Sequence, residues 1–188
     1  INKLGIELKF LDVGGGLGIS YTDSSFPSPS NLIKDLENIL SDRNEKIILE
    51  PGRSVSGDAG ILLTSVEYVK DDYLIIDAGM NDLIRPALYD AKHQIINVEN
   101  DKVPTKEWTI VGPICESSDV MAKNYSLGAS GGSILAIKTV GAYGHVMSSN
   151  YNSRRKPPEI LVDDNNFEII RKRETYEDLI RHEVNLGS

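Results

Sequence analysis

The chain has 188 residues, a formal net charge of −8 at pH 7, and 40% hydrophobic and 26% charged residues. This is the composition of a globular protein with one large domain or two small ones, and the negative charge argues against non-specific binding to nucleic acid, which needs a basic surface. No apolar run approaches the roughly 20 residues of a membrane-spanning helix, so no membrane partner is expected. A single cysteine cannot form an internal disulfide, which predicts a reducing, cytoplasmic location.

The first 53 residues have the pattern of alternating helices and parallel strands. The predicted elements are the end of a helix at 1–7, a buried strand and glycine loop at 8–18, a helix at 30–40, and a second strand and glycine turn at 46–53. Ser30 or Asn31 is the expected N-cap of the second helix. Two glycine-containing turns, each directly after a strand, are therefore expected at the same end of a parallel sheet.

The remainder of the chain reads as short strands separated by turns. Seven strands are predicted, at 61–70, 72–79, 93–100, 107–113, 133–143, 159–162 and 167–173. A helical or irregular segment at 80–91 interrupts them, and a helix at 175–183 follows them. This pattern predicts an antiparallel β-sandwich or barrel, with a domain boundary that separates residues 1–55 from 56–188.

Two parallel strands make a poor domain because their sheet edges stay open. A complete (β/α)₈ barrel takes about 250 residues and cannot fit here beside a β domain. The predicted fold is therefore α/β plus all-β: the last two βα units of a TIM-type (β/α)₈ barrel, followed by the β domain. Because the chain also begins without Met, we expect it to be the carboxyl-terminal part of a longer protein.

The two glycine turns carry groups that suit an anionic ligand. "GGGLG" at 14–18 offers backbone N–H groups that can cradle a phosphate, although a plain tight turn is an equal alternative. "EPGR" at 50–53 offers Glu50 to a protonated heterocycle nitrogen, the Gly52 N–H to a phosphate and Arg53 to a carboxylate. The alternative for this turn is a local ion pair between Glu50 and Arg53.

Two further motifs carry side chains that can bind or transfer a proton. Arg85 and Tyr89 would share one face of a helical turn and could both donate to a carboxylate, or else be a solvated arginine and a core tyrosine. Cys115 stands beside Glu116, so that a thiol acid adjoins an anion, unless the cysteine is inert. "VGAYGHVMSSNYNSR" at 140–154 is typical of a loop that approaches a ligand. The three histidines lack metal-ligand spacing, so no metal is expected.

The order of these motifs resembles one family. "LDVGGGLG", "EPGR", "IDAGMNDLIRPALYDA", "GPICESSD" and "GAYGHVMSSNYNSR" occur here in the order found in the diaminopimelate decarboxylases, pyridoxal 5'-phosphate enzymes of the alanine-racemase-like barrel class. "RPALYDA" and "MSSNYNSR" favour this family over the ornithine and arginine decarboxylases. The resemblance covers essentially the whole chain and implies decarboxylation of meso-2,6-diaminopimelate to L-lysine.

The resemblance also implies a role for each motif residue. The implied cofactor-binding residues are Gly14, Gly15, Gly16, Glu50, Pro51, Gly52, Arg53 and Tyr143, with Glu50 against the pyridine nitrogen. The implied substrate-binding residues are Arg53, Arg85 and Tyr89 on the distal carboxylate, Glu116 on the distal ammonium, and Tyr143. Cys115 is implied as the catalytic proton donor. In this family the Cys-Glu segment reaches into the partner subunit's site, which implies a homodimer with shared active sites.

Two family features have no counterpart in this sequence: the lysine that binds the cofactor covalently and the "HIGS" segment. We therefore expect the 188-residue chain alone to be inactive. Three other interpretations stay open: a related ornithine- or arginine-type decarboxylase, a non-catalytic homologue that regulates a partner enzyme, and a free-standing β domain that acts as a binding module.

Overall fold

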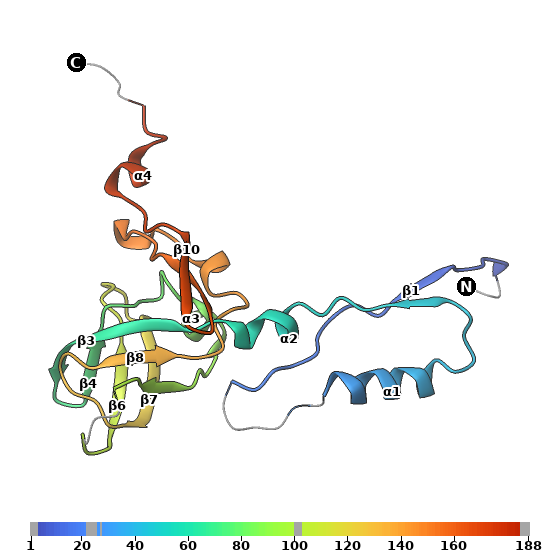
Figure 1. Cartoon of the computed structure of the whole chain (residues 1–188), viewed down its shortest axis with the longest axis horizontal. Coiled ribbons are helices and arrows are strands. Elements are labelled where there is room, and N and C mark those ends of the chain that lie inside the picture. Colours follow the sequence, from blue (N-terminus) through green and yellow to red (C-terminus); the bar gives the residue numbers. More distant parts are fainter. Residues whose placement is uncertain (1–3, 22–25, 27, 100–102, 185–188) are drawn as a thin grey trace.

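The amino-terminal part of the computed structural model is an extended βαβ unit (Figure 1). The structure describes residues 4–21, 26, 28–99 and 103–184. Strands β1 (Phe10–Asp12) and β2 (Lys46–Ile48) pair in parallel, and helix α1 (Pro29–Ile39) connects them. Of the helix end predicted at 1–7, residues 1–3 lie outside the described part and residues 6 and 7 are irregular.

Helix α1 begins two residues earlier than its predicted caps. The Ser28 side chain accepts a hydrogen bond from the Asn31 N–H at 3.2 Å, so Ser28 is the N-cap and the prediction of Ser30 or Asn31 is wrong. The reason is Pro29, whose missing N–H and fixed φ suit the first helical position. The apolar residues of this helix recur as predicted, but none of them is buried.

The βαβ unit leaves apolar surface open. Phe10 of β1 and Ile39 of α1 are 55% and 75% exposed, and β1 and β2 form a sheet of only these two strands among the described residues. The unit extends away from the rest of the molecule in Figure 1. An apolar face of this kind is stable in water only when another surface covers it.

The centre of the molecule is a curved, barrel-like sheet of six strands (Figure 1). Its strand order is β5-β8-β3-β4-β6-β7. The strands are β3 (Leu62–Lys70), β4 (Tyr73–Ile76), β5 (Ile95–Asn97), β6 (Lys106–Val111), β7 (Val120–Leu127) and β8 (Ile134–Ile137). All neighbouring pairs are antiparallel except β4 and β6. The prediction of a purely antiparallel domain is thus corrected to a mixed sheet, because the long connection through β5 returns the chain beside β4 in the same direction.

The seven predicted strands each overlap a strand of the structure, but two of them lie outside this sheet. Strands β9 (Glu159–Asp163) and β10 (Asn166–Arg171) form a separate antiparallel hairpin. Strand β7 has no counterpart among the predicted strands. Polar residues at its centre interrupt its apolar run, which is why the sequence pattern does not predict it. Its backbone is also irregular there, since Asn124 has a φ of 50°.

Short helices connect these strands or follow them. They are α2 (Arg53–Ser56), η2 (Gly57–Ala59), α3 (Arg85–Tyr89), η3 (His145–Met147), η4 (Tyr151–Ser153) and α4 (Tyr176–Ile180). The helical or irregular segment predicted at 80–91 contains α3, and the helix predicted at 175–183 is confirmed by α4, which starts with a capping box of Thr175 and Asp178. No helix in the described part of the chain has the length and apolarity to span a membrane.

The sheet encloses a single hydrophobic core. Its most buried members come from β3, β4, β6 and β8 and include Val66, Leu74, Ile76, Ile110, Leu135 and Ile137. Burial of each such side chain contributes roughly 1.5–3 kcal/mol relative to exposure. This core fixes the ends of β4, β6 and β8, and the segments that follow those ends carry Arg85, Cys115 and Tyr143.

Candidate active site

A cavity of about 540 Å³ opens where four segments meet: the glycine loop after β1, the turn after β2, α3 and the loop after β8. Its lining residues are Gly15, Gly16, Leu17, Glu50, Gly52, Arg53, Arg85, Tyr89, Tyr143 and Met147. Four of the five sequence motifs that suggest ligand binding thus contribute residues to one cavity, and the motif of Cys115 and Glu116 does not. Leu17 and Met147 are additional, since an apolar wall has no motif, while Gly14 and Pro51 adjoin the lining residues along the chain.

The wall formed by the glycine loop depends on its glycines. Gly14 and Gly16 have φ values of 74° and 91°, which favour glycine, and a Cβ on Gly15 would overlap the Glu50 carbonyl oxygen. The Glu50 N–H donates to the Gly14 carbonyl oxygen at 2.8 Å and joins this loop to the turn after β2. The result is a tight junction of two backbones at the edge of the cavity.

Glu50 and Arg53 do not form the local ion pair that was the alternative for this turn. None of the ion pairs among the described residues joins these two side chains, and both line the cavity instead. Arg53 is the first residue of α2, and the Gly52 carbonyl oxygen accepts the Val55 N–H at 3.1 Å, which sets the direction of the turn.

Arg85 is a buried cation inside a cage of three tyrosine rings. Its side chain is in α3, the residue is only 8% exposed, and its guanidinium carbon lies 5.2 Å from the ring centroid of Tyr21. The Tyr89 and Tyr143 ring centroids each lie 5.6 Å from the same carbon. Arg85 makes no ion pair with any carboxylate of the described residues, and its Nε lacks a hydrogen-bond partner there. A buried charge without a partner is costly, so this guanidinium is suited to an incoming anion.

Tyr21 and His93, which lie behind Arg85, belong to no motif that can be recognised in the sequence. Tyr21 packs edge-on against His93, with ring centroids 4.9 Å apart, and the His93 Nδ1 lies 2.9 Å from the Lys138 carbonyl oxygen. Because a carbonyl only accepts, Nδ1 carries the proton. Burial, together with the positive charge of Arg85, lowers the pKa of His93. A neutral imidazole therefore supports the cage without repelling the guanidinium.

Tyr143 enters the cavity in a strained backbone conformation. Its φ is 63°, in the left-handed region that bulky residues rarely adopt. The preceding loop approaches the chain closely, since a Cβ on Gly141 would overlap the Ser56 carbonyl oxygen. Strain of this kind concentrates at functional sites, where the surrounding structure holds it in place.

Cys115 and Glu116 do not line this cavity. They lie exposed on the loop after β6, which the Asp119 carboxylate closes by accepting the Ile114 N–H at 2.7 Å and the Met80 N–H at 2.6 Å. Burial raises the pKa of Asp119 above its usual value. Beside this loop is a second cavity of about 460 Å³, lined by Met80, Asn81, Ile84, Ser149 and Tyr151. The predicted site residues therefore fall into two groups, one in the first cavity and one on this exposed loop.

The first cavity offers groups that can hold the phosphate and the ring of pyridoxal phosphate. Backbone N–H groups of the glycine loop and the Arg53 side chain can hold a phosphate, and the Glu50 carboxylate can face a protonated ring nitrogen. Gly14 and Gly16 leave open space where a side chain would stand. The residues present thus fit the group. In the described part of the chain, no cluster of His, Cys, Asp and Glu could hold a metal ion.

Comparison with known proteins finds similar proteins in one family. A family model described as "Pyridoxal-dependent decarboxylase, C-terminal sheet domain" matches residues 20–141. The diaminopimelate decarboxylase of Neisseria meningitidis serogroup B is 46% identical over 184 residues, which cover 96% of this chain and 44% of that protein. The enzyme of the same name from Aquifex aeolicus is 43% identical, over 99% of this chain and 46% of its own. The chain spans about half the length of these relatives.

Solved structures that are similar to this chain belong to the same family. Diaminopimelate decarboxylase from Helicobacter pylori, complexed with L-lysine, is 43% identical with a TM-score of 0.89, over 96% of this chain and 46% of that one. Diaminopimelate decarboxylase from M. jannaschii, also in complex with L-lysine, is 40% identical with a TM-score of 0.90, over 98% of this chain and 45% of that one. These matches confirm the resemblance to the diaminopimelate decarboxylases. The chain belongs to the family of pyridoxal-dependent decarboxylases and carries their C-terminal sheet domain.

Proposed function

We propose that this chain is the carboxyl-terminal part of a diaminopimelate decarboxylase, which converts meso-2,6-diaminopimelate to L-lysine and CO₂ in the cytoplasm. The observation that supports this most is the buried, unpaired guanidinium of Arg85 in the cavity. Among basic amino acids, diaminopimelate is distinguished by a second carboxylate at its distal end. A site for ornithine or arginine would have no anion to place there.

Residues 1–55 would be the last two βα units of the (β/α)₈ barrel, and residues 56–188 the sheet domain. The exposed apolar face of the βαβ unit supports this division, because further barrel units would cover it. The second copy of a homodimer would supply what each cavity lacks.

Gly14, Gly15, Gly16 and the turn at 50–53 would hold the phosphate of pyridoxal 5'-phosphate, with Glu50 at the ring nitrogen and Tyr143 against the cofactor. When bound, this cofactor withdraws electrons from the bond to the departing carboxylate. The Glu50 carboxylate keeps the proton on the ring nitrogen by accepting its hydrogen bond. The packed junction of the two glycine turns fixes the backbone from which that carboxylate projects.

Arg85, Tyr89 and Arg53 would bind the distal carboxylate of the substrate, and Tyr143 would contact substrate as well as cofactor. The Arg85 guanidinium offers a planar pair of donors that matches a carboxylate, while the aromatic cage restricts its orientation. This contact places the other end of the substrate, where CO₂ departs, at a fixed distance from the anchor.

Cys115 and Glu116 of the partner subunit would complete the site. After CO₂ has left, the Cys115 thiol would give its proton to the carbon that carried the departing carboxylate, which becomes the ε carbon of L-lysine, and solvent would return a proton to the thiolate. Glu116 would accept hydrogen bonds from the distal ammonium. The absence of both residues from the cavity lining of their own chain supports their supply in trans.

The test uses the full-length protein that contains this chain, purified with pyridoxal phosphate. We expect stoichiometric release of CO₂ and L-lysine from meso-diaminopimelate, and no turnover by the 188-residue chain alone, which lacks the covalent cofactor lysine. Preferential decarboxylation of ornithine or arginine would favour the related enzyme class. No decarboxylation, with retained binding to another decarboxylase, would favour a regulatory homologue.

A further inference from the structure

We propose that Tyr151 is a positioning residue that fixes the Glu116 carboxylate and thereby sets the affinity of the site for a distal ammonium group. This inference rests on the proposed function, because it concerns the role of Glu116 in that site. It assigns a task to the "NYNSR" segment, whose Tyr151 lines the second cavity and lies outside the hydrophobic core.

The contact itself joins two loops that are far apart in the sequence. The Tyr151 hydroxyl donates a hydrogen bond to the Glu116 Oε2 at 3.2 Å. Among the described residues, Tyr151 is the one side chain that hydrogen-bonds this carboxylate. The bond uses one carboxylate oxygen and leaves Oε1 for a ligand. The hydrogen bond and the negative charge of Glu116 raise the pKa of Tyr151, so its hydroxyl keeps the proton that it donates.

Glu116 needs such a partner because only its backbone is fixed by the loop. The Glu116 N–H donates to the Ile114 carbonyl oxygen at 2.8 Å, and its own carbonyl oxygen accepts the Asp119 N–H at 3.1 Å. The side chain, by contrast, is exposed and has three rotatable bonds. An unrestrained glutamate would lose this rotamer freedom each time it bound a ligand, whereas a restrained one has lost it beforehand.

The segment that carries Tyr151 is itself held in a strained conformation. Asn152 and Ser153 have φ values of 58° and 54°, two consecutive non-glycine residues in the left-handed region. The Asn150 amide opposes this strain by donating to the Arg154 carbonyl oxygen at 2.9 Å, and Arg154 in turn donates to the Asp77 carbonyl oxygen at 2.6 Å. Backbone strain that is maintained by several bonds points to a functional position for the side chain it aims.

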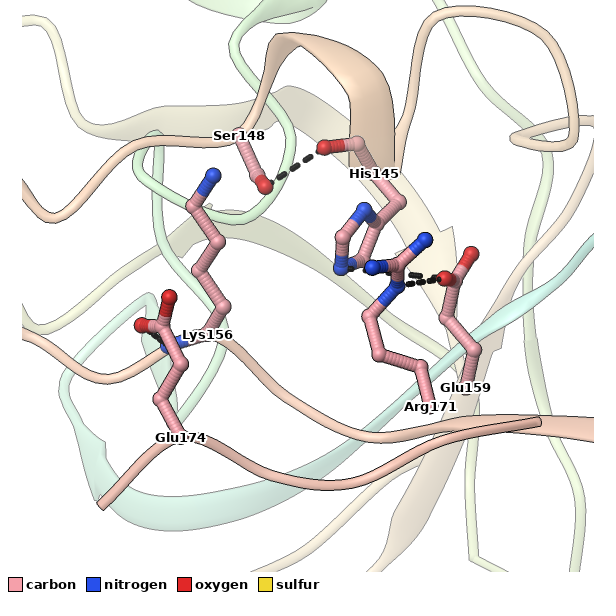
Figure 2. A network of polar contacts seen from close by, with 6 residues as sticks. All are labelled: His145, Ser148, Lys156, Glu159, Arg171 and Glu174. Carbon is pink, nitrogen blue, oxygen red and sulfur yellow. Dashed lines mark hydrogen bonds and ion pairs between the residues drawn. The ribbon is translucent and has the colours of Figure 1, made fainter. Parts of the chain in front are cut away.

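The carboxyl-terminal segment fixes the far side of this loop. Glu174, which follows β10, accepts the Asn150 amide at 2.6 Å and the Lys156 N–H at 2.8 Å. Figure 2 shows Glu174 against Lys156, with the pair of Glu159 and Arg171 on the β9–β10 hairpin close to His145. The loop that presents Tyr151 is therefore anchored to the hairpin side of the molecule as well as to the sheet.

Packing does not explain Tyr151. Its side chain is 45% exposed and lies outside the hydrophobic core, so removal of its hydroxyl leaves the fold intact. The effect of the change Tyr151→Phe is thus confined to the hydrogen bond with Glu116.

The experiment compares two ligands of the full-length holoenzyme by isothermal titration calorimetry. L-Lysine, the product, carries the distal ammonium as its α-ammonium, and 6-aminohexanoate has the same chain and carboxylate without it. We expect Tyr151→Phe to weaken L-lysine binding by about tenfold, the effect of losing a hydrogen bond to a charged group, and to leave 6-aminohexanoate binding unchanged. In turnover of meso-diaminopimelate, KM should rise while kcat changes by less than about threefold.

Two further variants sharpen the result. Asn150→Ala removes both bonds of the Asn150 amide and should reproduce the selective loss of L-lysine affinity, while Tyr68→Phe, at an exposed tyrosine of β3, should change nothing. Equal weakening of both ligands by Tyr151→Phe, or no change in either, overturns the role of Tyr151. A wild-type protein that binds L-lysine without decarboxylating meso-diaminopimelate contradicts the proposed function alone, and one that binds no L-lysine contradicts both.

Discussion

The guanidinium carbon of Arg85 lies 5.6 Å from the ring centroid of Tyr89, one helical turn further along α3. Helix α3 is short, and Asp90, with a φ of 50°, ends it directly after Tyr89. This single turn therefore presents both side chains to the cavity from one face. The pair is the part of the candidate site in which a local sequence pattern and the resulting geometry correspond most directly.

Cys115→Ala in the full-length protein should spare cofactor binding and lower kcat by about a hundredfold or more, the usual contribution of a general acid. The physical reason is that the thiol acts only after CO₂ has left. Cofactor absorbance and steady-state rates of lysine formation measure the two effects separately.

Supply of the thiol in trans predicts that this loss can be rescued. Cys115→Ala protomers mixed with protomers that lack the covalent cofactor lysine should form heterodimers with one complete site, and activity should return. If subunit exchange is demonstrated by mass spectrometry and the mixture stays inactive, Cys115 does not serve the neighbouring subunit.

Gly15→Ala should weaken the binding of pyridoxal phosphate. A methyl group there overlaps the Glu50 carbonyl oxygen, so the glycine loop and the turn after β2 must separate. We expect roughly a tenfold higher dissociation constant, since overpacking of this kind commonly costs 1–3 kcal/mol. Fluorescence titration with the cofactor measures it. Gly131→Ala, at a glycine with open space around it, is the matched control, and equal effects of the two changes would refute the assignment of the loop.

His93 should make stability depend on pH. The pKa of His93 is lowered in the folded chain. The stabilisation is therefore fully present above the pKa of the unfolded chain, about 6.5, and is lost as the pH falls from there through the pKa of the folded chain. His93→Gln should flatten this part of the profile. Urea unfolding at several pH values can follow Trp108, the one tryptophan of the chain and part of its core. An unchanged slope in His93→Gln would contradict the burial argument.

The strands that the sequence predicts well are rich in apolar and β-branched residues. β4 and β8 consist of consecutive apolar residues, and β3 begins with such residues and carries more of them further along, although only Thr64 and Val66 in it are buried. The parallel pairing of β4 with β6 could not be predicted, because strand order depends on the path of the long connection between them. Strand β7 could not be predicted for a different reason: its outward positions are polar and its pairing with β6 is irregular.

The site shows the same division between local and distant relationships. Gly15, Glu50 and Arg53 could be placed together from sequence, because parallel strands bring the turns after them to one edge. Tyr21 and His93 could not be placed beside Arg85, since their contact depends on how the loop after β1 packs against the segment before β5. The Gln94 N–H donates to the Tyr21 carbonyl oxygen at 3.0 Å, a long-range bond that no local pattern encodes.

The central claim is that Arg85 recognises a second carboxylate on the substrate. Its most direct test is the ratio of kcat/KM for meso-diaminopimelate to kcat/KM for D-lysine, which keeps the departing carboxylate and lacks the distal one, measured for the wild-type full-length protein and for Arg85→Lys. The ratio should strongly favour diaminopimelate in the wild type. It should fall by at least about tenfold in Arg85→Lys, because the lysine side chain at position 85 cannot reproduce the planar pair of donors. Arg155→Lys is the control, because Arg155 also stacks on a tyrosine, Tyr176, but outside the cavity. A ratio that is the same in Arg85→Lys as in the wild type would contradict the claim.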